Sequence, residues 1–87
     1  MAKKVEFGKF LILEVDMLDM AYVFQGYGIC DWCGRPIQGN GYYIAVLNSI
    51  YDKDCFEEWK KRARYYPSDA PIERRNYEFY SRKLQVE

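Results

Sequence analysis

Apolar residues follow two different spacings in the N-terminal part of the chain. Residues 5–15 contain the run FLILEV, whose composition suits either a strand or the start of a helix. From Asp16 onward the spacing is helical and predicts a helix over about residues 16–25, with Asp16 as its N-cap and Asp19 in its first turn. Gly26 then supplies a natural stop. The stripe expected to enter the core is Met17, Met20 or Ala21, and Phe24.

The middle of the chain alternates turn signals with residues that favour strands. Asn40-Gly41 is a strong short signal for a hairpin turn. Residues 42–47 are rich in aromatic and β-branched side chains, which predicts a strand. After a second turn at Asn48-Ser49, Ile50-Tyr51 predicts a short return strand. The pattern therefore predicts two hairpins in residues 34–51.

Two further helices are predicted in the C-terminal part. The first begins near Asp54 or Cys55, has Asp52 as a candidate cap, and ends at Pro67. Its expected apolar stripe is Phe56, Trp59, Ala63 and Tyr66. The second spans about residues 69–85 and is expected to dock on the domain through a narrower stripe. The members of that stripe are Ile72, Phe79 and Leu84.

Length and composition indicate one small folded domain. The 87 residues suffice for a single domain, and an aromatic content of 18% argues against disorder. We therefore expect a small α+β domain over residues 1–87. It divides into an N-terminal extension (5–28), a central unit (29–66) that contains every cysteine, and the C-terminal helix (69–85). A core this small gains much from a bound metal.

Charge is balanced overall but is unevenly distributed. Residues 1–59 hold five Lys and Arg against nine Asp and Glu, a net charge of −4, whereas residues 60–87 hold eight against four, a net charge of +4. One interpretation is that solvated helix faces of opposite sign partly neutralise each other within the fold. The alternative is a basic surface that binds an acidic partner.

The use of cysteine indicates a reducing compartment. Three cysteines is an odd number, which a disulfide framework would leave unpaired. The first residues do not lead into an uninterrupted apolar run, and no stretch approaches membrane-spanning length. We therefore expect a cytoplasmic protein with no membrane association, in which metal binding is the expected use of the thiols.

The three cysteines and one aspartate have the spacing of a metal site. Cys30 and Cys33 form a C-x2-C pair, and Asp52 and Cys55 form a second pair with the same spacing. Cys55 is expected at the start of a helix, where the helix dipole favours a thiolate. The chain has no histidine, so a fourth protein ligand must be a carboxylate or a less usual group. The paired spacing favours Asp52 over Asp54, and water in the fourth position remains open.

Two alternatives use the same cysteines without a metal. A disulfide or redox pair of Cys30 and Cys33 fits the C-x2-C spacing, but such pairs normally lie where a strand meets a helix, and hairpin signals follow this one. Three inert thiols are the other alternative. If a metal is bound, one Zn²⁺ is preferred over iron, because a mixed thiolate and carboxylate shell suits a redox-silent tetrahedral ion.

These residues resemble a known family. Cys30-x2-Cys33-Gly34-Arg35-Pro36-Ile37, a strand pair, and Tyr51-Asp52-x2-Cys55-Phe56 resemble the first zinc-binding half of a LIM domain, and more broadly a treble-clef zinc finger. The resemblance covers about residues 29–60. It implies a zinc knuckle, a β-hairpin and a helix whose first turn supplies the last ligands. LIM domains usually have histidine at the position of Asp52, and the second zinc module is absent because no cysteine follows Cys55.

LIM modules typically bind other proteins, so the resemblance implies a structural zinc in a protein-interaction module with an unknown partner. Four tyrosines are candidate interface residues: Tyr42, Tyr65, Tyr77 and Tyr80. The alternative is nucleic-acid binding by the basic C-terminal helices, in which acidic residues are interspersed. We do not expect an enzyme, because the histidine and glutamate signature of zinc deaminases is missing.

Overall fold

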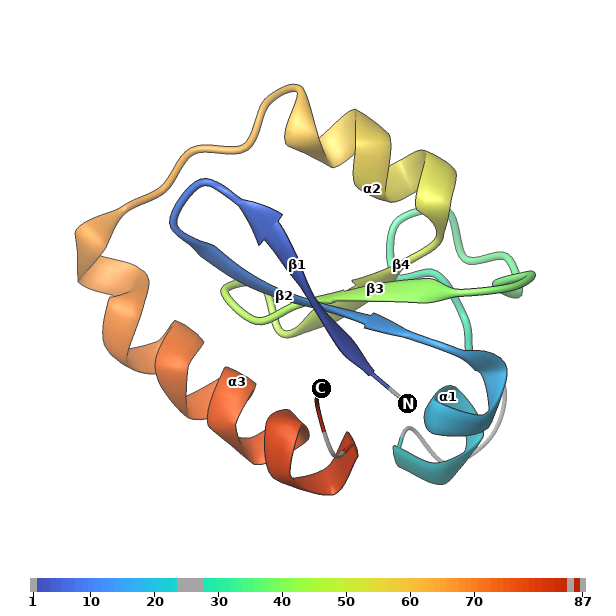
Figure 1. Ribbon diagram of the computed structural model, residues 1–87. Coiled ribbons are helices and arrows are strands. Elements are labelled where there is room, and N and C mark those ends of the chain that lie inside the picture. The colour runs from blue at the N-terminus through green and yellow to red at the C-terminus, as the bar shows by residue number, and fades with distance from the viewer. Residues whose placement is uncertain (1, 24–27, 85, 87) are drawn as a thin grey trace.

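The computed structural model describes residues 2–23, 28–84 and 86. Four strands and three α-helices follow one another along the chain, with a short 3-10 turn before the last helix (Figure 1). Their bounds are β1 Lys3–Phe7, β2 Phe10–Val15, α1 Met17–Val23, β3 Gly41–Ile44, β4 Ser49–Tyr51, α2 Lys53–Lys60, η1 Pro67–Asp69 and α3 Ala70–Leu84. This is a small α+β fold, as predicted. Among the described helices, none is long and apolar enough to cross a membrane.

A four-stranded antiparallel sheet forms the centre of the fold. Its strand order β1-β2-β3-β4 is that of the sequence. The segment that the sequence left undecided is the hairpin of β1 and β2, in which Phe7 pairs with Phe10 across a two-residue turn. Gly8 occupies the first turn position with φ 56°, the conformation that a type II′ turn requires there. Strand β2 then joins β3 with Ile12 opposite Ile44.

Helix α2 covers one face of the sheet with aromatic side chains. Phe56 stacks on Tyr42 of β3 with 4.5 Å between ring centroids, and Trp59 meets Phe10 of β2 edge-on at 5.0 Å. The ring of Phe7 lies 5.8 Å from Trp59 and extends this aromatic layer to β1. Because Phe56 and Trp59 are both buried, this part of the predicted helical stripe is confirmed.

Helices α1 and α3 cover the opposite face (Figure 1). Tyr43 of β3 packs against Tyr80 of α3 with 4.5 Å between centroids. Met20 of α1 lies against Gly41, where an added Cβ would approach its Sδ to 3.0 Å. The sheet is therefore the middle of three layers, and buried apolar side chains pack on both of its faces.

The first helix buries fewer residues than its pattern predicted. Asp16 and Asp19 form a reciprocal cap, in which each carboxylate accepts from the other residue's backbone N–H at 2.8 and 3.2 Å. The predicted cap is thus confirmed, but Met20 is the buried residue of α1 and Met17 is 64% exposed. A helix of this length offers a single turn to the sheet. Phe24 and Gly26 lie outside the described residues.

The hairpin predicted at Asn40-Gly41 is wrong. Gly41 is the first residue of β3 and lies opposite Val15 of β2, so a long-range pairing replaced the local turn. The predicted strand ends early at Ile44, and the turn before β4 begins at Ala45. Asn48 closes that turn with φ 51°, a left-handed conformation that asparagine tolerates.

The two C-terminal helices also differ from their patterns. Helix α2 ends at Lys60 and not at Pro67, which leaves Tyr66 exposed. On α3, Leu84 is buried as predicted, but Ile72 and Phe79 are 54% and 52% exposed.

Polar side chains attach α3 to the sheet and explain why these two apolar residues stay exposed. Glu73, which is 2% exposed, accepts a hydrogen bond from the Leu11 N–H at 3.0 Å. Asn76 Nδ2 donates to the Ala45 carbonyl at 2.9 Å.

Candidate metal centre

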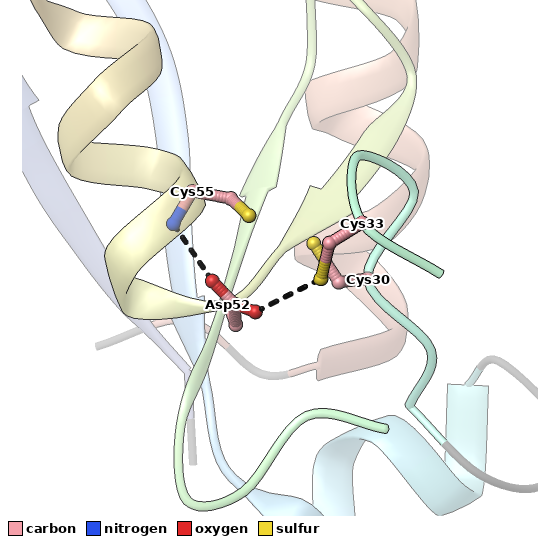
Figure 2. A group of neighbouring side chains, drawn as sticks. All are labelled: Cys30, Cys33, Asp52 and Cys55. Carbon is pink, nitrogen blue, oxygen red and sulfur yellow. Dashed lines mark hydrogen bonds between the residues drawn. The ribbon is translucent and has the colours of Figure 1, made fainter. Parts of the chain in front are cut away.

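The segment that carries Cys30 and Cys33 is a tight turn closed by its own backbone. The Cys30 N–H donates to the Arg35 carbonyl at 2.9 Å, and the Gly34 N–H donates to the Cys30 carbonyl at 2.8 Å. Gly34 has φ 75°, so a residue with a side chain would be strained there. These bonds place the two thiols of the C-x2-C pair on the same side of the turn (Figure 2).

Asp31 fastens this turn to the edge of the sheet. Its backbone N–H donates to the Ile50 carbonyl at 2.8 Å, and its carboxylate accepts from the Ile50 N–H at 2.8 Å. The turn therefore lies against the outer edge of β4, the strand that leads directly to Asp52. The sequence reasoning missed Asp31, because an acidic residue between two candidate ligands carries no signal of the strand edge that it will meet.

A cation–π contact joins the turn to the segment that follows α2. The Arg62 guanidinium lies 4.3 Å from the centre of the Trp32 ring, and that ring meets Tyr51 edge-on at 5.6 Å. Trp32 is 44% exposed, so this contact lies at the surface. It connects the cysteine turn to the residues just after α2, away from the candidate metal cluster.

Asp52 has two functions through its two carboxylate oxygens. It is the N-cap of α2, where Oδ1 accepts from the Cys55 N–H at 2.7 Å. Oδ2 points in the other direction and accepts from the Cys33 thiol at 3.4 Å (Figure 2). One side chain thereby fixes the first turn of α2, which carries Cys55, relative to the turn that carries Cys33.

The ligand atoms of Cys30, Cys33, Asp52 and Cys55 all lie within 4.8 Å of one another. Two sulfurs on one tetrahedral zinc are about 3.8 Å apart, and a sulfur and a carboxylate oxygen about 3.5 Å apart, given the usual bond lengths. The distance of 3.4 Å between Cys33 Sγ and Asp52 Oδ2 is close to the second value. The donor set therefore fits one tetrahedral metal ion with small adjustments of the side chains.

The four groups differ in how readily they ionise. The Cys55 backbone N–H lowers the pKa of Asp52 below its usual range, so this group is a carboxylate at neutral pH. The Arg35 backbone N–H, together with the Arg35 side chain, lowers the pKa of the Cys33 thiol. Burial, and then hydrogen bonds within the cluster, raise the pKa of Cys55. A bound cation would replace the protons of such a cluster.

Arg35 supplies positive charge beside this acidic cluster. Contact with Cys33 raises the pKa of its guanidinium, and the charges of Asp52 and Cys55 act in the same direction. The sequence reasoning placed Arg35 in the motif but gave it no role. Asp54, the alternative fourth ligand, does not join the cluster. It lines an open surface depression of about 460 Å³ next to the site, together with Arg35, Pro36, Gln38, Asp52 and Lys53.

The structure thus brings together all four residues that the sequence proposed as metal ligands, and all three cysteines are free thiols. Comparison with protein-family models, with curated proteins and with solved structures found no match to this chain. The resemblance to LIM domains therefore rests on the residues of the site alone. What the geometry itself supports is a cluster of three cysteines and one aspartate that is compatible with one metal ion.

Proposed function

We propose that this chain is a zinc-binding module in which one Zn²⁺ has a structural role. The observation that carries the proposal is the convergence of four ligand atoms within 4.8 Å from two separate segments. Zinc accepts thiolate and carboxylate ligands in tetrahedral geometry, and it is redox-inactive, which suits a structural role. Bound there, the ion would join the cysteine turn to α2.

We propose further that the cysteine turn, the β3–β4 hairpin and α2 form a treble clef built into the larger sheet. The order of these parts along the chain supports this, as does the position of Cys55 in the first turn of α2. Four protein groups would fill the tetrahedral shell and leave no position for a reacting water. The proposed site is therefore structural, and we propose that the chain is not an enzyme.

Metal analysis of the purified protein tests the site. The wild type should bind one equivalent of zinc. Asp52→Ala should lose it or bind it far more weakly, because this change removes one ligand and the cap of α2. The matched control is Asp54→Ala, which should keep the metal because Asp54 lies outside the cluster. A wild type without stoichiometric metal, or a metal-free Asp54→Ala beside a metal-loaded Asp52→Ala, would refute the assignment.

We propose that the module acts by binding another protein through α1. The exposed side of this helix consists of large apolar groups: Met17 is 64% exposed, Leu18 81% and Tyr22 78%. The helix's acidic group Asp19 belongs to its N-terminal cap and leaves that side uncharged. Such a surface fits a partner with an apolar patch. The four tyrosines predicted for an interface are only partly exposed and pack against the core.

The helix surface can be tested without knowing the partner. Leu18→Asp should change the free energy of unfolding by no more than about 0.5 kcal/mol, because Leu18 is exposed. In affinity capture it should lose a specific protein that the wild type retains. Arg82→Asp, an exposed change on α3, is the matched control and should retain that protein. Identical captured proteins for all three forms would refute the role of α1.

A further inference from the structure

The two edge strands of the sheet differ in whether another segment bonds to their outer side. Strand β4 is covered along its outer edge by Asp31, which exchanges two hydrogen bonds with Ile50. Strand β1 forms the other edge and pairs only with β2. Within residues 2–23, 28–84 and 86, no hydrogen bond joins another segment to the outer side of β1. This edge therefore offers backbone donors and acceptors to a further strand.

The turn of the β1–β2 hairpin determines which residues of β1 face outward. Phe7 and Phe10 close a two-residue turn and so form a hydrogen-bonded pair. Hydrogen-bonded and non-hydrogen-bonded pairs alternate along an antiparallel ladder, so Val5 also bonds to β2. The N–H and C=O groups of Lys4 and Glu6 therefore point to the free edge. Both side chains are exposed, by 44% and 83%, and in the single chain they form a surface ion pair of 3.9 Å with each other, which contributes little and can rearrange to pair across a second strand.

We propose that β1 pairs antiparallel with β1 of a second copy of this chain, with the two Val5 residues opposite each other. In this register the outward backbone groups of Lys4 meet those of Glu6 in the second copy, and the reverse pair forms by symmetry. The backbone groups on both strands thus have the correct direction for hydrogen bonds. The two sheets become one continuous eight-stranded sheet.

Charge selects this register over its neighbours. If one strand slides by two residues in either direction, the backbone hydrogen-bond geometry is preserved. Lys4 then lies opposite Lys4 of the second copy, or Glu6 opposite Glu6. Like charges directly opposite each other destabilise a strand pair, whereas opposite charges stabilise it. Lysines on an edge strand normally discourage pairing with other chains. Here the Lys4 and Glu6 pattern is complementary to itself, so the same charges reject a general strand and accept a second copy.

The size of the contact determines how strong the association is. A pair of five-residue strands buries less surface than a stable dimer interface requires, which places this dimer among weak and reversible associations. We expect a monomer at low concentration and a rising dimer fraction as the concentration approaches about 1 mM. The helices α1 and α2 and the metal cluster stay outside the contact, so the inference does not depend on the proposed function.

Sedimentation of the metal-loaded protein over this concentration range tests the proposal with a charge-exchange set. Lys4→Glu and Glu6→Lys should each weaken self-association about tenfold, because each creates two like-charge pairs. An equimolar mixture of the two variants should associate at least as well as the wild type, because opposite charges then meet at both positions. Amide exchange at Lys4 and Glu6 should slow as concentration rises, while that of Val5 stays slow throughout.

Several results would overturn the proposal. A wild type that remains monomeric to about 1 mM has no such pairing. Unchanged association of Glu6→Lys would exclude the register centred on Val5. A dimer abolished by Leu18→Asp but insensitive to both charge variants would place the interface on α1 and not on β1. A mixture no more associated than either single variant would likewise refute it.

Discussion

Helices α2 and α3 cover opposite faces of one sheet and are held there by different means. Helix α2 has 8 residues, begins at a candidate metal ligand and inserts Phe56 and Trp59 into an aromatic layer. Helix α3 has 15 residues, buries Leu84 and leaves the apolar side chains of Ile72 and Phe79 half exposed. Its attachment relies on a buried carboxylate, Glu73, and on ring contacts. Apolar rings thus hold the short helix against the sheet, whereas polar side chains share in holding the long helix.

The difference shows where apolar patterns are informative. On α2 the spacing of apolar residues identified the buried side, because the sheet beneath it is aromatic and accepts only apolar groups. On α3 the same reasoning selected the wrong residues at two of three positions. There the helix passes the end of β2, where β3 has already turned away and the Leu11 N–H needs an acceptor. A carboxylate satisfies it, and an apolar side chain would not.

The largest expected effect concerns α2. Cys55→Ser should abolish stoichiometric zinc binding and lower the free energy of unfolding by several kcal/mol, because structural zinc contributes its binding free energy to folding. Chemical denaturation with and without a chelator measures this. The control is Asp54→Ser in the same helical turn, which should behave as the wild type. An unchanged midpoint for Cys55→Ser would contradict a structural metal.

Removal of the metal by a chelator also tests the comparison of the two helices. In amide hydrogen exchange, addition of a chelator should remove protection from α2 before α3, because the contacts of α3 with β2 do not involve the cluster. Simultaneous loss of protection in both helices would show that the domain unfolds as one unit and that the metal supports both faces.

A smaller effect is expected on the α3 side. Glu73→Ala should cost about 1–3 kcal/mol, because it leaves the partly buried Leu11 N–H without its acceptor. Glu78→Ala on the exposed side of the same helix, and Ile72→Ala, should each stay within about 0.5 kcal/mol of the wild type. Urea denaturation of the three variants measures the difference. If Ile72→Ala lowers the free energy of unfolding more than Glu73→Ala does, the predicted apolar stripe, and not Glu73, is the side by which α3 docks.

The cluster was predictable because its information is local. Two pairs with x2 spacing, the absence of histidine and a candidate helix cap at Asp52 can be read without a fold, and the structure places all four side chains together. The supporting residues Asp31 and Arg35 were not predicted. Their roles depend on segments that meet them only after folding: Ile50 at the strand edge and the neighbouring acidic cluster.

The sequence by itself determined the four residues of the candidate metal cluster, the cap of α2, the cap of α1 and the buried side of α2, since each depends on residues within a turn or on one helical period. Only the tertiary structure decided that residues 3–15 form a hairpin, that Gly41 extends β2's partner strand and that Glu73 faces the sheet. Each of these is a pairing between distant segments. A backbone group needs a hydrogen-bond partner once it is buried, but the chain alone does not say which segment will provide it.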